Sequence, residues 1–244
     1  MKKQDVIYLL ATVLFFLPFF TVDAVYQWYK AFNAEHYLIM AFLKFGVLAT
    51  YGEVLGLRVK TGRYNAPNFG ILPRALVWGL FGIWIAAMFG IFKAGVPAFL
   101  DKMGLCGLLE AFNASGFSGY KLLGAFGISV FMNATFAPVF MTLHKITDTH
   151  IGMNGGSLKA FVRPIKFTEI ITSLNWNVQW NFVFKKTIPF FWIPMHTLTF
   201  ILPSEYQVLF AALLGIALGL ILSIASMKSG LKDKKEVETP IKSL

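Results

Sequence analysis

Six long apolar stretches constrain the fold of this chain more than any other feature of its sequence. They occupy residues 6–25, 37–57, 75–97, 120–143, 187–203 and 206–227. A helix that crosses the hydrocarbon of a bilayer needs about 20 residues, with a range of about 17 to 25, and each stretch falls in that range. Only 14% of the residues are charged, whereas soluble domains have about a quarter. The sequence therefore predicts an all-α, polytopic transmembrane helix bundle of about six spans.

The distribution of Lys and Arg predicts how these spans are oriented. Basic residues gather in the loop after the second stretch, in the long loop after the fourth, and in the tail sequence KSGLKDKK. Short loops rich in Lys and Arg stay on the cytoplasmic side of a membrane. Six spans place these basic segments and both termini on that side. If the short stretch 187–203 is an elbow rather than a crossing, the count falls to five and the basic tail lies outside.

The chain is expected to form one membrane domain with additions at both ends. The predicted segments are an extra N-terminal span with its outer loop at 1–36, a helix bundle at 37–228, and a basic cytoplasmic tail at 229–244. The first span has an alternative interpretation, because Lys2 and Lys3 precede the apolar run and Val22-Asp23-Ala24 has the small-residue form of a signal cleavage site. A retained span is favoured because the apolar run is long.

Several classes of function lack their signatures in this sequence. The net charge of +10 could suggest nucleic acid, but the basic residues form no continuous stripe, so we expect no nucleic-acid partner. A single cysteine, Cys106, excludes an intramolecular disulfide and a thiolate metal cluster within one chain. The motifs of metal hydrolysis, of a serine nucleophile and of a phosphate-binding loop do not occur. We therefore expect a protein that is not an enzyme and that holds no cofactor and no metal.

Glu53 stands near the cytoplasmic end of the second apolar stretch. At helical spacing it shares a face with Gly46, Ala49 and Gly56, all of them small. Gly52 and Gly56 also have the small-xxx-small spacing of closely packed membrane helices. Glu53 is therefore predicted to point toward protein rather than lipid.

Two roles for Glu53 stay open at this stage. An unpaired charge in the hydrocarbon costs a few kcal/mol, so the carboxylate is expected either to be protonated or to have a partner. Arg58 and Arg74 flank the same cytoplasmic loop and are its candidate ion-pair partners. In the first role, the carboxylate lines a water-filled path, where it favours cations or relays protons. In the second, a structural ion pair fixes the second span to the third.

Polar residues of the later stretches form a second candidate site. His196 and Thr199 lie three residues apart and share a helix face, while Asn133 lies within the fourth stretch. Such groups need partners or water inside a membrane bundle. Hydrogen bonding between helices is favoured over the lining of a path. A second ligand at His-x-x-x-His spacing is missing, so the histidine does not indicate a metal.

Several of these residues resemble the signatures of the peroxisomal membrane protein 22 kDa family. The resemblance covers residues 44–227 and is most specific near the C-terminus. Its first half consists of Gly46, Leu48, Gly52, Glu53, Arg74 and Gly82, with the family's Gly-Asp present here as Gly-Glu. Its second half consists of Met132-Asn133, Ala137-Pro138, Trp192, His196, Thr199-Phe200, Pro203, Tyr206-Gln207 and Leu222-Ser223. The resemblance implies four core spans, to which 6–25 would be an addition, and a role as a pore for small solutes or in membrane homeostasis.

We expect an integral protein of the plasma or inner membrane that forms a weakly selective pore for small solutes. Its polar lining is expected to contain Glu53, Arg74, Asn133, His196 and Thr199. The alternative is a structural or assembly protein without transport activity, which associates through glycine-rich helix faces. The candidate faces are Gly52 with Gly56 and Gly215 with Gly219. The lipid bilayer is the expected partner in both cases, and a homo-oligomer is a candidate assembly.

Overall fold

All regular secondary structure of the computed structural model is helical over the residues that it describes, 2–217 and 219–220. The predicted all-α class is therefore confirmed. The chain divides into two compact units, Met1–Met40 and Ala41–Leu244, which we describe separately.

The first unit is built from three helices. They are α1 (Lys3–Phe16), α2 (Pro18–Thr21) and α3 (Asp23–Glu35). The run Lys3–Thr21 is long and apolar enough to cross a membrane. Val22 adopts an extended conformation, with φ −117° and ψ 102°, and ends this run. The candidate span thus ends before residue 25, the predicted boundary. The rings of Phe19 and Tyr29, 5.8 Å apart and edge to face, join α2 to α3.

The second unit contains three long helices and several short ones. The long helices are α4 (Tyr37–Thr61, whose first residues belong to the first unit), α5 (Ile71–Lys102) and α7 (Gly119–Met153). The short elements are α6 (Leu108–Asn113), η1 (Leu158–Phe161), α8 (Phe167–Ser173), α9 (Trp176–Val178), η2 (Gln179–Trp192) and α10 (Ile193–Ile201), followed by a helix over Ser204–Ala217. Within the described part of the chain, four helices are long and apolar enough to cross a membrane: Lys3–Thr21, α4, α5 and α7.

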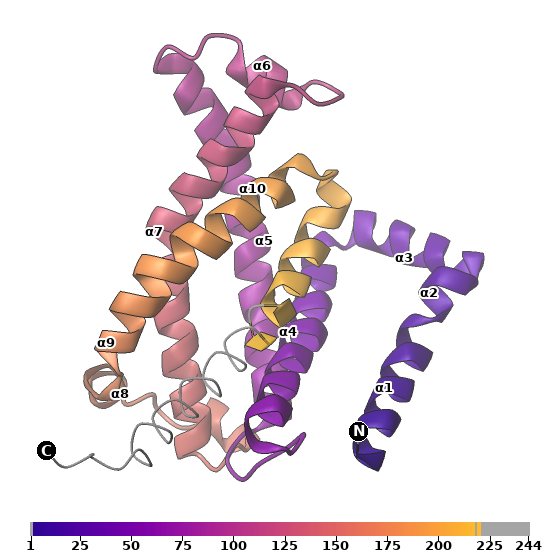
Figure 1. The fold of residues 1–244 in the computed structure, drawn as a ribbon, viewed down its shortest axis with the longest axis vertical. Coiled ribbons are helices and arrows are strands. Elements are labelled where there is room, and N and C mark those ends of the chain that lie inside the picture. Colours follow the sequence, from indigo (N-terminus) through magenta and orange to yellow (C-terminus); the bar gives the residue numbers. More distant parts are fainter. Residues whose placement is uncertain (1, 218, 221–244) are drawn as a thin grey trace, which may run out of the picture. The chain divides into compact units, whose positions relative to one another are not determined.

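The ends of the long helices bring distant residues to one end of the unit. Gly70 has φ 72°, a left-handed conformation that favours glycine, and it begins α5 after the turn from α4. Ser118 caps α7, because its hydroxyl accepts a hydrogen bond from the backbone N–H of Lys121 at 3.0 Å. In Figure 1, α4 ends, α5 begins and α7 ends at the lower end of the drawing. Residues at these helix ends are therefore neighbours in space.

Glycines allow α4 to approach its neighbours closely. A Cβ at Gly46 would lie 3.0 Å from the carbonyl oxygen of Ala75, and a Cβ at Gly82 would overlap the backbone of Ala41. Small residues permit this backbone contact between membrane helices. Gly46 of α4 and Gly82 of α5 thus permit close contact between these two helices.

The other glycines that were predicted to pack lie in different surroundings. A Cβ at Gly52 would lie 2.8 Å from Cα of Ile216, so Gly52 contacts the helix Ser204–Ala217. Gly56 is buried, and a Cβ at Gly219 would lie 3.4 Å from the carbonyl oxygen of Gly52. A Cβ at Gly215, by contrast, would have no described atom within 4 Å. Gly215 therefore does not pack against the described part of the chain.

The fifth predicted stretch, 187–203, is the end of a longer helical run. The elements α9, η2 and α10 follow one another from Trp176 to Ile201, and they lie across α7 in Figure 1. Pro189 and Pro194 each lack a backbone donor, and the helix type changes between them, from π to α at Ile193. This run is not among the four helices of spanning length and hydropathy. The sixth stretch, 206–227, begins in Ser204–Ala217 and includes the helical residues 219–220. Its residues 218 and 221–227 lie outside the described residues, as does the predicted tail 229–244.

Candidate functional site

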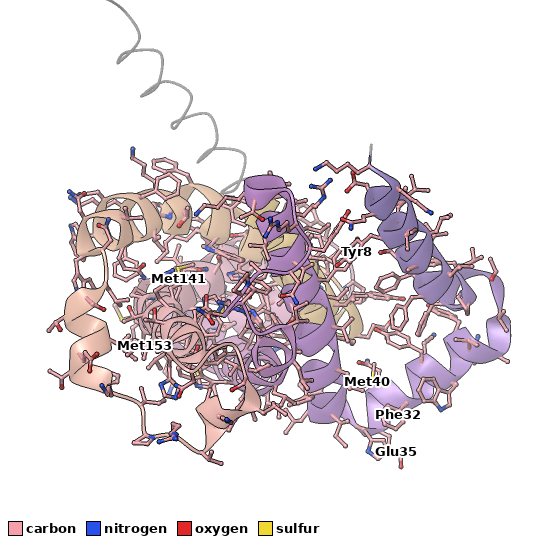
Figure 2. The ribbon with its side chains drawn as sticks, turned by 90° about the horizontal axis from the view of Figure 1, so that it is seen from below. Tyr8, Phe32, Glu35, Met40, Met141 and Met153 are labelled. Carbon is pink, nitrogen blue, oxygen red and sulfur yellow. The ribbon has the colours of Figure 1, made fainter. Side chains whose placement is uncertain are left out.

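Ionisable side chains from three long helices meet at one end of the second unit. Glu53 lies in the C-terminal half of α4, Arg74 in the first turn of α5, and His144 and Asp148 near the end of α7. Figure 2 looks onto this end of the structure and labels Met153, the last residue of α7. We call these four residues the inner cluster.

Arg74 is the centre of the inner cluster. Its Nη1 donates to Glu53 Oε2 at 2.7 Å and also to Asp148 Oδ1. Its Nε donates to the backbone carbonyl oxygen of Phe69 at 2.7 Å, and the guanidinium lies over the Phe69 ring, 4.5 Å from its centroid. One cation thus bridges two carboxylates that come from different helices.

His144 and Trp78 complete the partners of Glu53. Trp78 Nε1 donates to Glu53 Oε1 at 3.0 Å, and His144 Nε2 lies 3.0 Å from the same oxygen. His144 Nε2 is also 3.7 Å from Asp148 Oδ1. The rings of Trp78 and His144 lie 4.5 Å apart. Both oxygens of Glu53 therefore have hydrogen-bond partners.

The inner cluster is largely shielded from solvent and carries an excess of acid. The exposed fractions of its side chains are 12% for Arg74, 18% for Glu53, 22% for His144 and 17% for Asp148. Two carboxylates and one guanidinium leave one negative charge when the imidazole is neutral, and none when it is protonated. One further proton or cation would therefore neutralise the cluster when the imidazole is neutral.

Three residues of the inner cluster have the chemistry of metal ligands. One ligand atom each from Glu53, His144 and Asp148 lies within 4.8 Å of the others. Two carboxylate oxygens and an imidazole nitrogen suit Zn²⁺ and related ions. Arg74, however, already donates to both carboxylates. A metal ion would have to displace the guanidinium, so the arrangement fits an ion-pair cluster better than a metal centre.

A second polar group lies between α7 and α10. His196 Nδ1 is 3.0 Å from Asn133 Nδ2 and 3.3 Å from Asn133 Oδ1. Asn133 Nδ2 also donates to the carbonyl oxygen of Ser129 at 2.9 Å, and Ser129 Oγ donates to the carbonyl oxygen of Ile193 at 2.7 Å. Trp192 stacks on His196, with 5.1 Å between ring centroids. We call Ser129, Asn133 and His196 the central polar group.

Aromatic rings separate the central polar group from the inner cluster. Phe136 and Phe140 of α7 lie between Asn133 and His144 along the same helix. Trp84 contacts Phe136 with ring centroids 4.7 Å apart, and Phe81 contacts Phe140 at 5.0 Å. These four rings are half-buried and form an apolar column between α5 and α7.

The structure brings some predicted site residues together and places others apart. Of the two candidate partners of Glu53, Arg74 makes the ion pair, while Arg58 lies over the Tyr64 ring at 5.3 Å. Asn133 and His196 contact each other, whereas the Thr199 hydroxyl donates to its own helix at Met195.

The described residues that resemble the family signature do not form one site, and they contact different parts of the second unit. Trp192 packs on His196, Phe200 contacts Phe89, and Gly82 packs against α4. Pro138 lies inside α7, where its carbonyl oxygen accepts from Thr142. Pro203 and Tyr206 lie at the start of the helix Ser204–Ala217.

Sequence reasoning missed His144, Asp148 and Trp78. The predicted apolar stretch ends at residue 143, which assigns the following residues to a basic loop. In the structure α7 continues to Met153. His144 and Asp148 are four residues apart and so share one helix face, which is the signal that could have found them.

Over the described residues, the fold and these contacts define an all-helical protein with four helices of membrane-spanning length and hydropathy and a part-buried ion-pair cluster among three long helices. No family model, no curated protein and no solved structure matches this chain. The resemblance to the peroxisomal membrane protein 22 kDa family therefore stays a prediction.

Proposed function

We propose that this chain is an integral membrane protein that forms a weakly selective path for small solutes, with the inner cluster at its cytoplasmic end. The observation that carries the proposal is the convergence of Glu53, Arg74, His144 and Asp148, from α4, α5 and α7, on one point. The family resemblance supports the same function. The basic loops favour the plasma or inner membrane with both termini in the cytoplasm.

A purely structural role accounts poorly for so many ionisable groups. Two charges that are taken out of water lose hydration, and a buried ion pair often stabilises a fold no more than apolar side chains of similar size. Ionisable residues inside membrane segments are costly and mark ion, proton or solute pathways. The four groups of the inner cluster therefore favour a functional role over simple joining of helices.

The charge of the inner cluster predicts which solutes are favoured. Two carboxylates face one guanidinium, so with His144 neutral a path beside them attracts cations and repels anions. In this proposal, the bridge of Arg74 between both acids narrows this end of the path, and the rings of Trp84, Phe81, Phe136 and Phe140 make its middle apolar. Hydrophobic constrictions of this kind gate membrane pores by excluding water.

The second candidate function is that of a structural or assembly protein. Gly46, Gly52 and Gly82 are engaged within the chain, which leaves them unavailable to a partner. Gly215 has no described neighbour within 4 Å of its Cβ position and is the residue that favours this alternative. Replacement of Gly215 by Leu would break a complex built on that face. A change of oligomeric state in Gly215→Leu, measured by light scattering in detergent, would support assembly over conduction.

Release of solutes from proteoliposomes tests the proposed path. Vesicles with the purified full chain are loaded with K⁺, with a small anion, with a small neutral solute or with a large dextran. We expect release of K⁺ faster than release of the anion, and retention of the dextran. Asp148→Asn removes one acid from the cluster and should reduce the preference for K⁺. Release from folded protein no faster than from protein-free vesicles would refute the proposal.

A further inference from the structure

A cavity lies at the end of the second unit opposite the inner cluster. It has a volume of about 450 Å³ and is lined by residues of α5, α6, α7, α10 and the helix Ser204–Ala217. Pockets for small ligands have volumes of about 300–1,000 Å³. The cavity is thus large enough for a headgroup-sized ligand.

The cavity is positively charged. Lys93 of α5 and Lys121 of α7 both line it, and none of the described lining residues carries a carboxylate. Lys93 Nζ donates to Ser204 Oγ at 2.8 Å, and Lys121 Nζ donates to the carbonyl oxygen of Ala114 at 2.7 Å. Each ammonium has three protons, so each keeps donors for an anion after these contacts.

The remaining wall of the cavity is apolar and aromatic. Phe200 is 2% exposed and Phe112 is 7% exposed, so both form a fixed wall, whereas Phe117 at the rim is 71% exposed. The Phe200 ring is held against Phe89 at 4.9 Å, and Phe112 packs on the face of Gly124 in α7. The cavity thus combines two ammonium groups with an apolar, aromatic wall.

The position of the cavity along α7 corresponds to the level of lipid headgroups. Lys121 lies in the first turn of α7, and His144 of the inner cluster lies near its other end. At about 1.5 Å per residue the two are about 35 Å apart along the helix. A hydrocarbon core is about 30 Å thick. If the inner cluster lies at the cytoplasmic boundary, the cavity lies at the outer one.

We propose that this cavity binds the phosphate of an anionic phospholipid. Lys93 and Lys121 contact the phosphate, as lysine does in other phosphate sites, while Phe112, Phe117 and Phe200 contact the upper part of the acyl chains. Basic pockets between membrane helices bind lipid headgroups for the same reason. This inference does not depend on conduction by the chain.

Native mass spectrometry of the purified full chain in a neutral detergent tests this site. Phosphatidylglycerol and phosphatidylcholine with the same acyl chains are added in parallel, and the retained lipid is measured. We expect preferential retention of phosphatidylglycerol. Lys93→Gln and Lys121→Gln should each reduce it about fivefold, because a basic residue near a lipid surface contributes about 1 kcal/mol.

Lys102→Gln is the matched control, because Lys102 lies at the same end of α5 but does not line the cavity. We expect it to retain the lipid as the wild type does. Equal losses in Lys102→Gln and Lys121→Gln would overturn the proposal, since they would indicate general surface charge. Equal retention of the two lipids would overturn it as well. If soluble glycerol phosphate displaces the lipid at equal concentration, the site binds a soluble phosphate and the lipid assignment is wrong. Either lysine variant alone suffices if the other fails to fold.

Discussion

Arg74 Nη1 lies 2.7 Å from Glu53 Oε2, and this contact joins the first turn of α5 to α4. The same nitrogen donates to Asp148 of α7, so one guanidinium connects the three long helices. Removal of Arg74 would leave two part-buried carboxylates with a single imidazole, that of His144, beside them.

We therefore expect Arg74→Gln to lower the free energy of unfolding by about 3–5 kcal/mol, the cost of breaking a buried ion pair on one side. Arg74→Lys keeps the charge but loses the Nε donor to the Phe69 carbonyl oxygen and the planar guanidinium over the Phe69 ring, so its stability should lie between those of the wild type and Arg74→Gln. Unfolding of the detergent-solubilised protein by sodium dodecyl sulfate measures the difference. Wild-type stability in Arg74→Gln would show that the ion pair does not hold the helices together.

Close packing of α4 on α5 gives a second prediction. A Cβ at Gly82 would overlap the carbonyl oxygen of Ala41, so Gly82→Ala should destabilise the protein by about 1–3 kcal/mol through overpacking. Gly90 is the matched control on the same helix, because a Cβ there would meet no described atom within 4 Å. Gly90→Ala should stabilise by about 0.5–1 kcal/mol, since Ala favours the helix more than Gly. Thermal unfolding of Gly82→Ala and Gly90→Ala measures both changes in stability. Equal changes in the two variants would contradict the close packing of α4 on α5.

The geometry of the inner cluster also predicts that a metal site appears when Arg74 is removed. In Arg74→Ala, the ligand atoms of Glu53, His144 and Asp148 can converge on one ion, with water as the fourth ligand. We expect Zn²⁺ to raise the unfolding temperature of Arg74→Ala but not of the wild type. Mg²⁺ should have little effect, because it prefers oxygen ligands in an octahedron. The double variant Arg74→Ala/Asp148→Asn lacks one ligand and should respond weakly to Zn²⁺. An equal response of the wild type would show that Arg74 does not occupy the site.

Hydrophobic length predicted the long helices well, because crossing a bilayer fixes how many apolar residues a helix needs. The stretches at 37–57, 75–97 and 120–143 lie within α4, α5 and α7. All three helices extend beyond the apolar stretches, and in α7 the contacts of Asp148 with Arg74 and His144 outweigh the low intrinsic helix propensity of Asp. The first span ends where Val22 adopts an extended backbone conformation, and amino-acid composition alone does not predict that conformation.

The candidate site was partly predictable. Glu53 and Arg74 lie on either side of the loop between α4 and α5, so Arg74 was one of two candidate partners, beside Arg58, and the structure selects Arg74. Their contact with Asp148 depends on how α7 packs against α5, more than 70 residues further along the chain. Asn133 and His196 were both recognised as polar residues, but their mutual contact depends on the crossing of α7 and α10. No local sequence pattern predicts how α7 packs against α5 or where it crosses α10.

The reversal potential of the purified chain in a planar bilayer under a salt gradient tests the central claim most directly. Wild type, Glu53→Gln and the control Glu110→Gln, which changes an acid of α6 outside the inner cluster, are compared. Our account predicts discrete currents with a cation preference that falls in Glu53→Gln and is kept in Glu110→Gln, because the proposal places Glu53, and not Glu110, beside the path. A folded wild type without currents, or currents whose selectivity is the same in all three proteins, would contradict the claim and leave Glu53 as a structural partner of Arg74.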